Sequence, residues 1–99
     1  MQVYELGYLV LSSIAEEAVG SVVAKLKELI TKAGGTEIDS ENPEKIELAY
    51  TMTKVVGASR YVVNDAYIGW IKFEALPETA PTLNEKVAKM DEIVRCLLV

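Results

Sequence analysis

Apolar and polar side chains alternate along four segments of the chain, as they do in half-buried β-strands. The second segment is interrupted near Asn42-Pro43, and the third follows a turn at 57–59 and has an expected irregularity at Asn64-Asp65. The sequence therefore predicts four strands, of which the second and third form a long hairpin. The predicted strands are residues 3–11, residues 36–41 with 45–56, residues 60–75 and residues 92–99.

Two further segments repeat apolar residues every three or four positions, which is typical of an amphipathic helix. The first helix is predicted over residues 14–33, with Ser13 and Glu16 spaced as a capping box and Gly34-Gly35 at its end. The second helix is predicted to begin with another capping box, residues 82–85. Its inward-facing residues are Leu83, Val87 and Met90.

The order of these elements, β-α-β-β-α-β, is that of the ferredoxin-like split β-α-β fold in the α+β class. Right-handed crossovers place both helices on one face of a four-stranded antiparallel sheet. We expect a single such domain over residues 1–99, because 99 residues can close one core but not two. The opposite face of the sheet, which we call the bare face, then has no covering layer.

Strand parity predicts which side chains lie on each face of the sheet. The face under the helices receives Tyr4, Leu6, Tyr8, Val10, Ile71, Phe73, Cys96 and Leu98. The bare face receives Leu9, Ile68, Trp70, Lys72, Ile93, Arg95 and Leu97. A contiguous apolar patch indicates an interaction site, and tryptophan and arginine are frequent at interface hot spots. The predicted partner-binding residues are Ile68, Trp70, Arg95 and Leu97.

Three other arrangements would cover part of this face without a foreign partner. The acidic residues 41–47 could fold over Trp70, Arg95 could pair with Glu5 across strands, or a second copy of the chain could bind sheet to sheet. A homodimer in isolation therefore stays open. An alternative function also stays open, that of a self-associating regulatory or small-ligand-binding domain, because a fold alone does not set function.

The composition argues against several classes of enzyme. The chain has no histidine and one cysteine, Cys96, so it lacks the commonest general base, the usual metal ligand and any internal disulfide. The acid pairs Glu16-Glu17 and Asp91-Glu92 are adjacent in sequence and point in different directions. We therefore expect no enzyme activity, catalytic residue, metal or cofactor. Without an apolar run of about 18 residues or a basic leader, we also expect no membrane span and a cytoplasmic location.

The formal net charge of −5 argues against nucleic-acid binding, but the charge is unevenly distributed. Residues 36–48 hold five acids against one cation, Lys45. Residues 49–73 hold a single acid, Asp65, against three cations, Lys54, Arg60 and Lys72. The net number therefore does not describe each part of the surface.

Four segments resemble, in order and spacing, the bacterial small-subunit ribosomal protein six family. They are YELGYLVL in the first strand, LAYTM at 48–52, AYIGWIKFEALPE at 66–78 and the closing DEIVRCLLV. The resemblance implies the split β-α-β fold and a structural role on the ribosome. It also implies binding to the central domain of small-subunit rRNA together with a small basic partner, ribosomal protein eighteen. Trp70 and Arg95 fall where the family's motif has an aromatic residue and an arginine.

The resemblance also carries expectations for individual residues. Tyr4 should lie in the core, Leu48-Ala49-Tyr50 should be largely structural, and Thr51 replaces the family's usual proline. The span before AYIGW is longer than usual, so the hairpin should project further. Tyr61 either stacks on an unpaired base or packs across the strands. The predicted RNA-binding residues are Lys45, Lys54, Arg60, Lys72 and Arg95.

Overall fold

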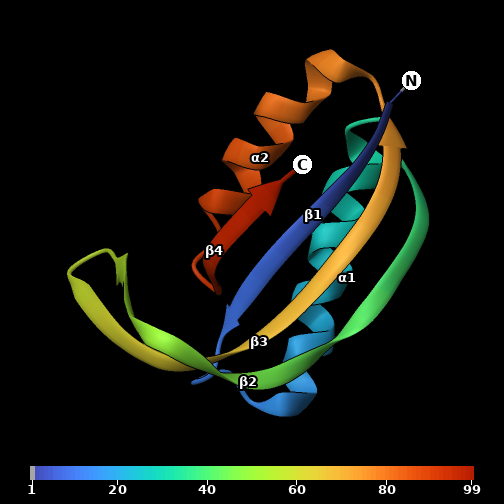
Figure 1. Cartoon of the computed structure of the whole chain (residues 1–99). Coiled ribbons are helices and arrows are strands. Elements are labelled where there is room, and N and C mark those ends of the chain that lie inside the picture. Colours follow the sequence, from blue (N-terminus) through green and yellow to red (C-terminus); the bar gives the residue numbers. More distant parts are fainter. Residues whose placement is uncertain (1) are drawn as a thin grey trace.

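The computed structural model describes residues 2–99 and has the predicted ferredoxin-like architecture (Figure 1). Its elements are β1 (Gln2–Leu11), α1 (Glu16–Lys32), β2 (Thr36–Val56), β3 (Ser59–Ala75), a 3-10 turn (Pro77–Thr79), α2 (Ala80–Ala88) and β4 (Ile93–Leu98). The strands form one antiparallel sheet in the order β2-β3-β1-β4. Both helices cover the same face of this sheet, so the bare face exists as predicted.

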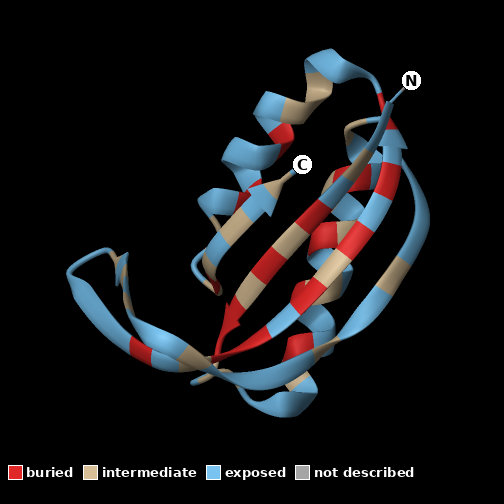
Figure 2. Cartoon of the chain, in the orientation of Figure 1, coloured by how far each residue is buried: buried red, intermediate tan, exposed pale blue. Residues whose placement is uncertain are grey.

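The core lies between the sheet and the two helices. Buried and exposed residues alternate along β1 and β3, which Figure 2 shows as stripes. Leu6, Ile71 and Phe73 are fully buried and pack against apolar residues of both helices, including Leu26 and Leu83. All eight residues predicted for the covered face belong to this cluster or pack against it, Tyr4 among them. Strand parity therefore assigned this face correctly.

Ile93 does not lie on the bare face, where parity placed it. Leu9 pairs with Arg95, but the next residue of β1, Val10, pairs with Ile93. This bulge gives β4 one extra residue. Side chains before the bulge therefore point to the opposite face of the sheet from the one that strict alternation predicts. Ile93 is consequently 1% exposed and part of the core.

Both predicted capping boxes are wrong. α1 begins at Glu16 after Ala15, two residues later than predicted, and no side chain caps it. α2 begins at Ala80, before the predicted cap at Thr82, and has a proline in its first turn. Proline suits that position because its missing N–H would have no partner within the helix. The end of α1 was predicted correctly, since Gly34 adopts a φ of 89°.

The β2–β3 hairpin extends well beyond the sheet (Figure 1). The interruption predicted at Asn42-Pro43 is a register shift between Glu41 and Glu44. A larger shift, between Glu47 and Met52, lies opposite the irregularity predicted at Asn64, and its extra residues belong to β2. We call residues 48–64 the arm.

A second, smaller apolar cluster anchors the root of the arm. Leu11, Val63 and Ala66 are its buried members, and Leu48 and Met52 pack against them. Because an isolated two-stranded hairpin is only marginally stable, packing in this cluster stabilises the arm. Gly57, with a φ of 58°, closes the turn at the tip.

Gly69 makes room for Tyr8, which lies across from it on β1. A Cβ at Gly69 would lie 2.5 Å from the Tyr8 hydroxyl oxygen, closer than real Cβ contacts allow. That hydroxyl is buried and has no hydrogen-bond partner within residues 2–99. Burial raises the pKa of Tyr8 to about 12.

Gly69→Ala is expected to destabilise the fold by about 1–3 kcal/mol, because the Tyr8 ring must move within a close-packed core. Urea unfolding measures this loss. Gly7→Ala is the matched control, since a Cβ there meets nothing closer than 3.8 Å. In a Tyr8→Leu background, Gly69→Ala should lower the free energy of unfolding by less. An equal cost in both backgrounds would contradict the clash with Tyr8.

An ion pair links α1 to the start of β4, with Lys25 Nζ 2.9 Å from Glu92 Oε2. The hydrogen bond from Lys25 holds the pKa of Glu92 below its ordinary value. A lowered carboxyl pKa stabilises the fold at pH values above the unfolded-state pKa, and this contribution is lost as the pH falls through the folded-state pKa. Both groups are partly solvated, so Lys25→Met should cost about 0.5 kcal/mol at pH 7. The cost should shrink as the pH falls below the ordinary glutamate pKa of about 4.3; a cost unchanged by pH in urea unfolding would contradict this assignment.

Candidate functional site

The predicted partner-binding residues surround Gly7 on the bare face. Gly7 lies opposite Trp70 on one side and Leu97 on the other, while the next residue of the same face, Leu9, lies between Ile68 and Arg95. Ile68 is 43% exposed and Leu97 68% exposed. The structure therefore brings all four predicted residues together, from two strands on either side of β1.

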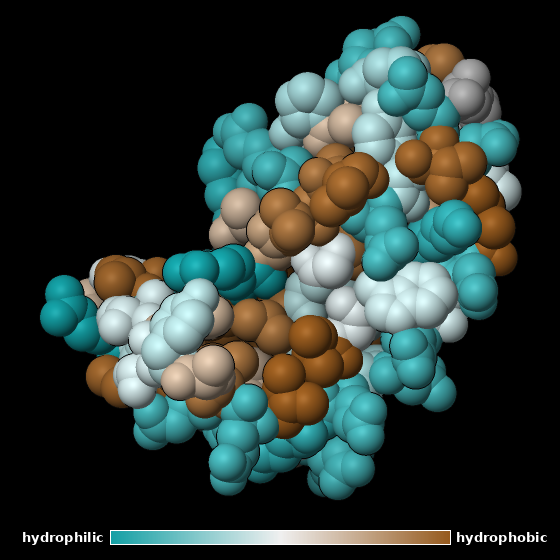
Figure 3. Space-filling model, viewed as in Figure 1, coloured by the Kyte–Doolittle hydropathy of each residue, from teal (hydrophilic) through white to brown (hydrophobic). Residues whose placement is uncertain are grey.

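These residues line a hollow of about 350 Å³ whose walls are almost entirely apolar. The hollow exists because Gly7 has no side chain to fill the space between Trp70 and Leu97. Figure 3 shows brown, apolar atoms at the centre of this face with teal, polar atoms around them. A concave apolar centre with a polar rim is the usual form of a protein-binding site.

Trp70 is half-buried, and Glu41 of β2 fixes its orientation. The indole Nε1–H donates a hydrogen bond of 2.7 Å to Glu41 Oε2. Glu41 is the cross-strand partner of Trp70, so part of the acidic segment does lie beside the indole. It does not close the hollow, whose lining includes Trp70.

Carboxylates outnumber cations on the bare face. Pairing across the strands and alternation along them place five acids on this side of the sheet, Glu5, Asp39, Glu41, Glu44 and Glu74. The cations of this face are Lys72 and Arg95. The bare face therefore carries net negative charge, while the charged residues that line the hollow itself are Glu5 and Arg95.

The ion pair considered between Arg95 and Glu5 does not form. The register puts Arg95 opposite Leu9, whereas Glu5 exchanges backbone hydrogen bonds with Val99. No carboxylate within residues 2–99 lies within 4 Å of the Arg95 guanidinium. Arg95 is therefore an exposed cation at the rim of the hollow.

Four of the five predicted RNA-binding residues carry no ion pair with the described part of the chain. Lys45 is the exception, because its Nζ lies 3.7 Å from Asp65 Oδ2. The unpaired four occupy two places: Lys72 and Arg95 on the bare face, Lys54 and Arg60 on the arm. The structure therefore does not bring the five cations into one patch.

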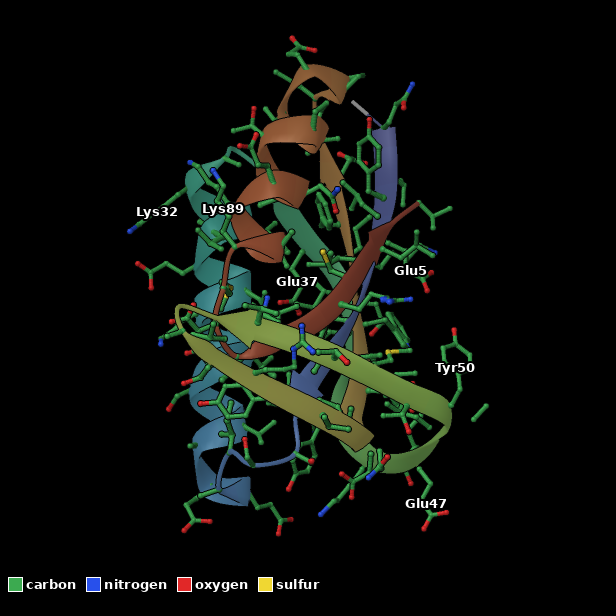
Figure 4. All side chains as sticks on the ribbon, turned by 90° about the vertical axis from the view of Figure 1, so that its left-hand side faces the viewer. Glu5, Lys32, Glu37, Glu47, Tyr50 and Lys89 are labelled. Atoms are coloured by element: carbon green, nitrogen blue, oxygen red, sulfur yellow. The ribbon has the colours of Figure 1, made fainter. Side chains whose placement is uncertain are left out.

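Tyr50 was predicted to be structural, and its position shows that this was wrong. It is 64% exposed, in the part of β2 that the register shift displaces from the ladder. In Figure 4 it lies on the same side of the molecule as Glu5, opposite to Lys32 and Lys89. Tyr50 therefore joins the exposed residues of the bare-face side.

Sequence reasoning missed Gly7, which could have been found, because a glycine at a bare-face position removes a side chain from the middle of a patch. It named Glu41 only as one member of the acidic segment 41–47 that could cover Trp70. The sequence did not single out Glu41 within that segment, because its pairing with Trp70 depends on the bulge at Asn42-Pro43.

Two kinds of feature, a metal-ligating cluster and a membrane-spanning helix, are absent from the part of the chain that the structure describes. Within residues 2–99 no group of three metal-ligating side chains lies close enough to hold an ion. No helix in the same range has the length and apolarity needed to cross a bilayer. An apolar hollow on an open sheet face is the kind of feature that marks interaction surfaces.

The chain belongs to the ribosomal protein S6 family, whose pattern it matches over residues 3–99. It is 31% identical to small ribosomal subunit protein bS6 of Clostridium perfringens, over 100% of this chain and 96% of that protein. The bS6 protein of Clostridium novyi is 29% identical with the same coverage. The fold is similar to that of 30S ribosomal protein S6 from Thermotoga maritima, with a TM-score of 0.81 and 18% identity over 99% of this chain and 85% of that one.

This membership confirms the family that the four sequence segments resembled. The chain is a structural, non-enzymatic protein of the small ribosomal subunit, and its location is the ribosome in the cytoplasm. The site residues themselves remain predictions from the sequence and from the geometry above.

Glu41→Ala is expected to release the indole of Trp70, the chain's only tryptophan. Acrylamide should then quench the tryptophan fluorescence more strongly than in the unmodified protein, because the ring loses its fixed position. Glu44→Ala is the control, since Glu44 lies in the same strand as Glu41 but pairs with Ile68 and not with Trp70. Equal quenching in the two variants would contradict the role of Glu41.

Proposed function

We propose that the chain holds a small basic ribosomal protein, protein eighteen, on its bare face and binds the central domain of small-subunit rRNA together with it. The observation that carries the first part is the apolar hollow around Gly7, on a sheet face that carries five carboxylates and two cations. A basic partner gains from this charge, while an apolar side chain can fill the hollow. Trp70 is the central contact because it is large, half-buried and held by Glu41.

The same charge disfavours the alternative of a sheet-to-sheet homodimer. Two copies of a surface with net negative charge repel each other when they are brought together. A small-ligand site on this face is also disfavoured, because the hollow is open to solvent and would bury little of a ligand's surface.

The cations without an ion pair support direct contact with RNA. Phosphate binding needs lysine and arginine that are free to exchange their counterions. Lys72 and Arg95 lie beside the proposed partner site and would bind phosphates at its border, whereas Lys45 already has a carboxylate partner.

Trp70→Ala is expected to reduce association with small subunits at least tenfold, because hot-spot truncations cost about 2 kcal/mol or more. The measurement is the amount of tagged protein, expressed in its host, that sediments with salt-washed small subunits. Gly7→Val is a second variant: it fills the hollow without removing Trp70, and valine suits a strand. Leu76→Ala, at an exposed site away from the hollow, is the control.

Normal sedimentation of both Trp70→Ala and Gly7→Val would contradict the role of the bare face. A homodimer that stays at the top of the gradient, identified by light scattering, would favour the self-associating alternative. Circular dichroism and the thermal midpoint establish that each variant is folded.

A further inference from the structure

The two faces of the arm differ in what covers them. Cross-strand pairing puts Met52 and Val63 on one face of the ribbon, together with the pair Lys54 and Tyr61. Met52 and Val63 pack in the second apolar cluster. Lys54 Nζ donates a hydrogen bond of 3.4 Å to the carbonyl oxygen of Ala88, the last residue of α2. This inner face is therefore turned toward the rest of the molecule.

The outer face of the arm is exposed on both strands. It carries two cross-strand pairs, Thr53 with Val62 and Val55 with Arg60. Val62 is 66% exposed and Val55 59% exposed, and the two are diagonal neighbours on the ribbon. Figure 1 shows the arm projecting past the end of the sheet, which leaves this face free to reach another molecule. Two valines beside an arginine can dock on an apolar site that carries negative charge.

The hollow of the bare face has room for an aliphatic side chain. Trp70 and Leu97 flank Gly7 from the strands on either side of β1. Neighbouring strands lie about 4.8 Å apart, so the backbones of these two walls are about 10 Å apart. A valine that points toward Gly7 fits between such walls.

The unpaired charges at the two surfaces have the same spacing. Glu5 lines the hollow two residues from Gly7 and has no ion pair within residues 2–99. Arg60 lies two residues from Val62 on the outer face and likewise has no ion pair in this range. Two residues of extended strand span about 7 Å in both cases. With Val62 over Gly7, Arg60 therefore reaches Glu5.

Arg95, the other charged residue that lines the hollow, distinguishes the two directions in which the arm could lie. It pairs with Leu9, on the far side of Gly7 from Glu5. Glu5 and Leu9 are four residues apart on β1, or about 14 Å. The reversed arm would bring Arg60 beside Arg95, and contact between like charges is unfavourable. The charges therefore favour the direction in which Arg60 lies at Glu5.

We propose that the outer face of the arm docks in the bare-face hollow of a second copy of this chain. Val62 fills the space over Gly7, and Arg60 pairs with Glu5 of that copy. The contact brings an arm without acids to a face on which carboxylates outnumber cations, so it avoids the repulsion that opposes two bare faces. The inference goes beyond the proposed function, because it concerns copies whose hollow holds no other protein.

The contact joins two different surfaces, so it does not close on itself. A pair of copies still has one free arm and one free hollow, and further copies add head to tail. The outer face of a short ribbon is smaller than a standard interface, so the association is weak and reversible. An arm in the hollow also keeps other proteins out, so self-association and partner binding compete.

The first test measures the mean mass of the full chain by sedimentation velocity at low ionic strength. Protein concentrations extend to about 1 mM, since weak contacts have a Kd of this order. The mean mass should rise past that of a dimer. Val62→Glu should abolish the rise, because it would bury an unpaired carboxylate in an apolar hollow. Leu76→Glu is the matched control, since it adds the same charge at an exposed site away from the arm and the hollow.

A mixture of two variants tests whether the contact joins an arm to a hollow. Val62→Glu has a defective arm and an intact hollow, whereas Gly7→Val has a filled hollow and an intact arm. Each variant alone should stay monomeric. An equimolar mixture should form a dimer that grows no further, because it contains one functional arm and one functional hollow. Circular dichroism and the thermal midpoint establish that both variants are folded.

Exchange of the two charges tests the predicted ion pair. Glu5→Arg and Arg60→Glu should each weaken self-association about fivefold, since each replaces an attraction at the surface by a repulsion. A chain that carries both substitutions should regain most of the lost affinity. Failure of this recovery would overturn the pairing of Arg60 with Glu5.

Three results would overturn the docking itself. They are a monomeric mass at every concentration, a mass that stops at the dimer for the unmodified chain, and a mixture of Val62→Glu and Gly7→Val that does not associate. A mass that stops at the dimer would assign the contact to two equivalent surfaces. The proposed function is judged separately, by the sedimentation of Trp70→Ala with small subunits, so either can fail while the other stands.

Discussion

A β-sheet has two faces, and this chain has helices for only one of them. Ninety-nine residues supply four strands and two helices, and both helices lie on the same side. The covered side satisfies the hydrophobic requirement of folding with fully buried residues such as Leu6 and Phe73. The bare face does not contribute to this core, so its side chains can be selected for binding without loss of core packing.

Two glycines in neighbouring strands have different effects on the two faces of the sheet. Gly69 points under the helices, where its missing side chain leaves space for the ring of Tyr8. Gly7 faces the other way, where its missing side chain leaves the hollow beside Trp70. The same residue type therefore improves the packing of the core on one face and produces the hollow on the other.

The sequence predicted those features that depend on alternation and failed where a strand changes register. Parity identified the covered face and the residues around Gly7, because β1 and β3 pair in unbroken register. It misplaced Ile93 because one bulge reverses the alternation, and nothing local in the sequence marks that position. The contact between the acidic segment and Trp70 was one of the alternatives that the sequence left open, but the sequence did not single out Glu41, since its pairing depends on how the bulged β2 pairs with β3. Both capping boxes failed because their spacing is common in sequences that do not use it.

The net charge of this protein describes neither of its two charged surfaces. The net charge of −5 averages an acidic sheet face with an arm that carries no acid at all. A basic partner of the kind proposed above is attracted to the bare face and repelled by the arm. Segregation of charge along the chain thus gives one small acidic domain two surfaces of opposite sign, which its net charge conceals.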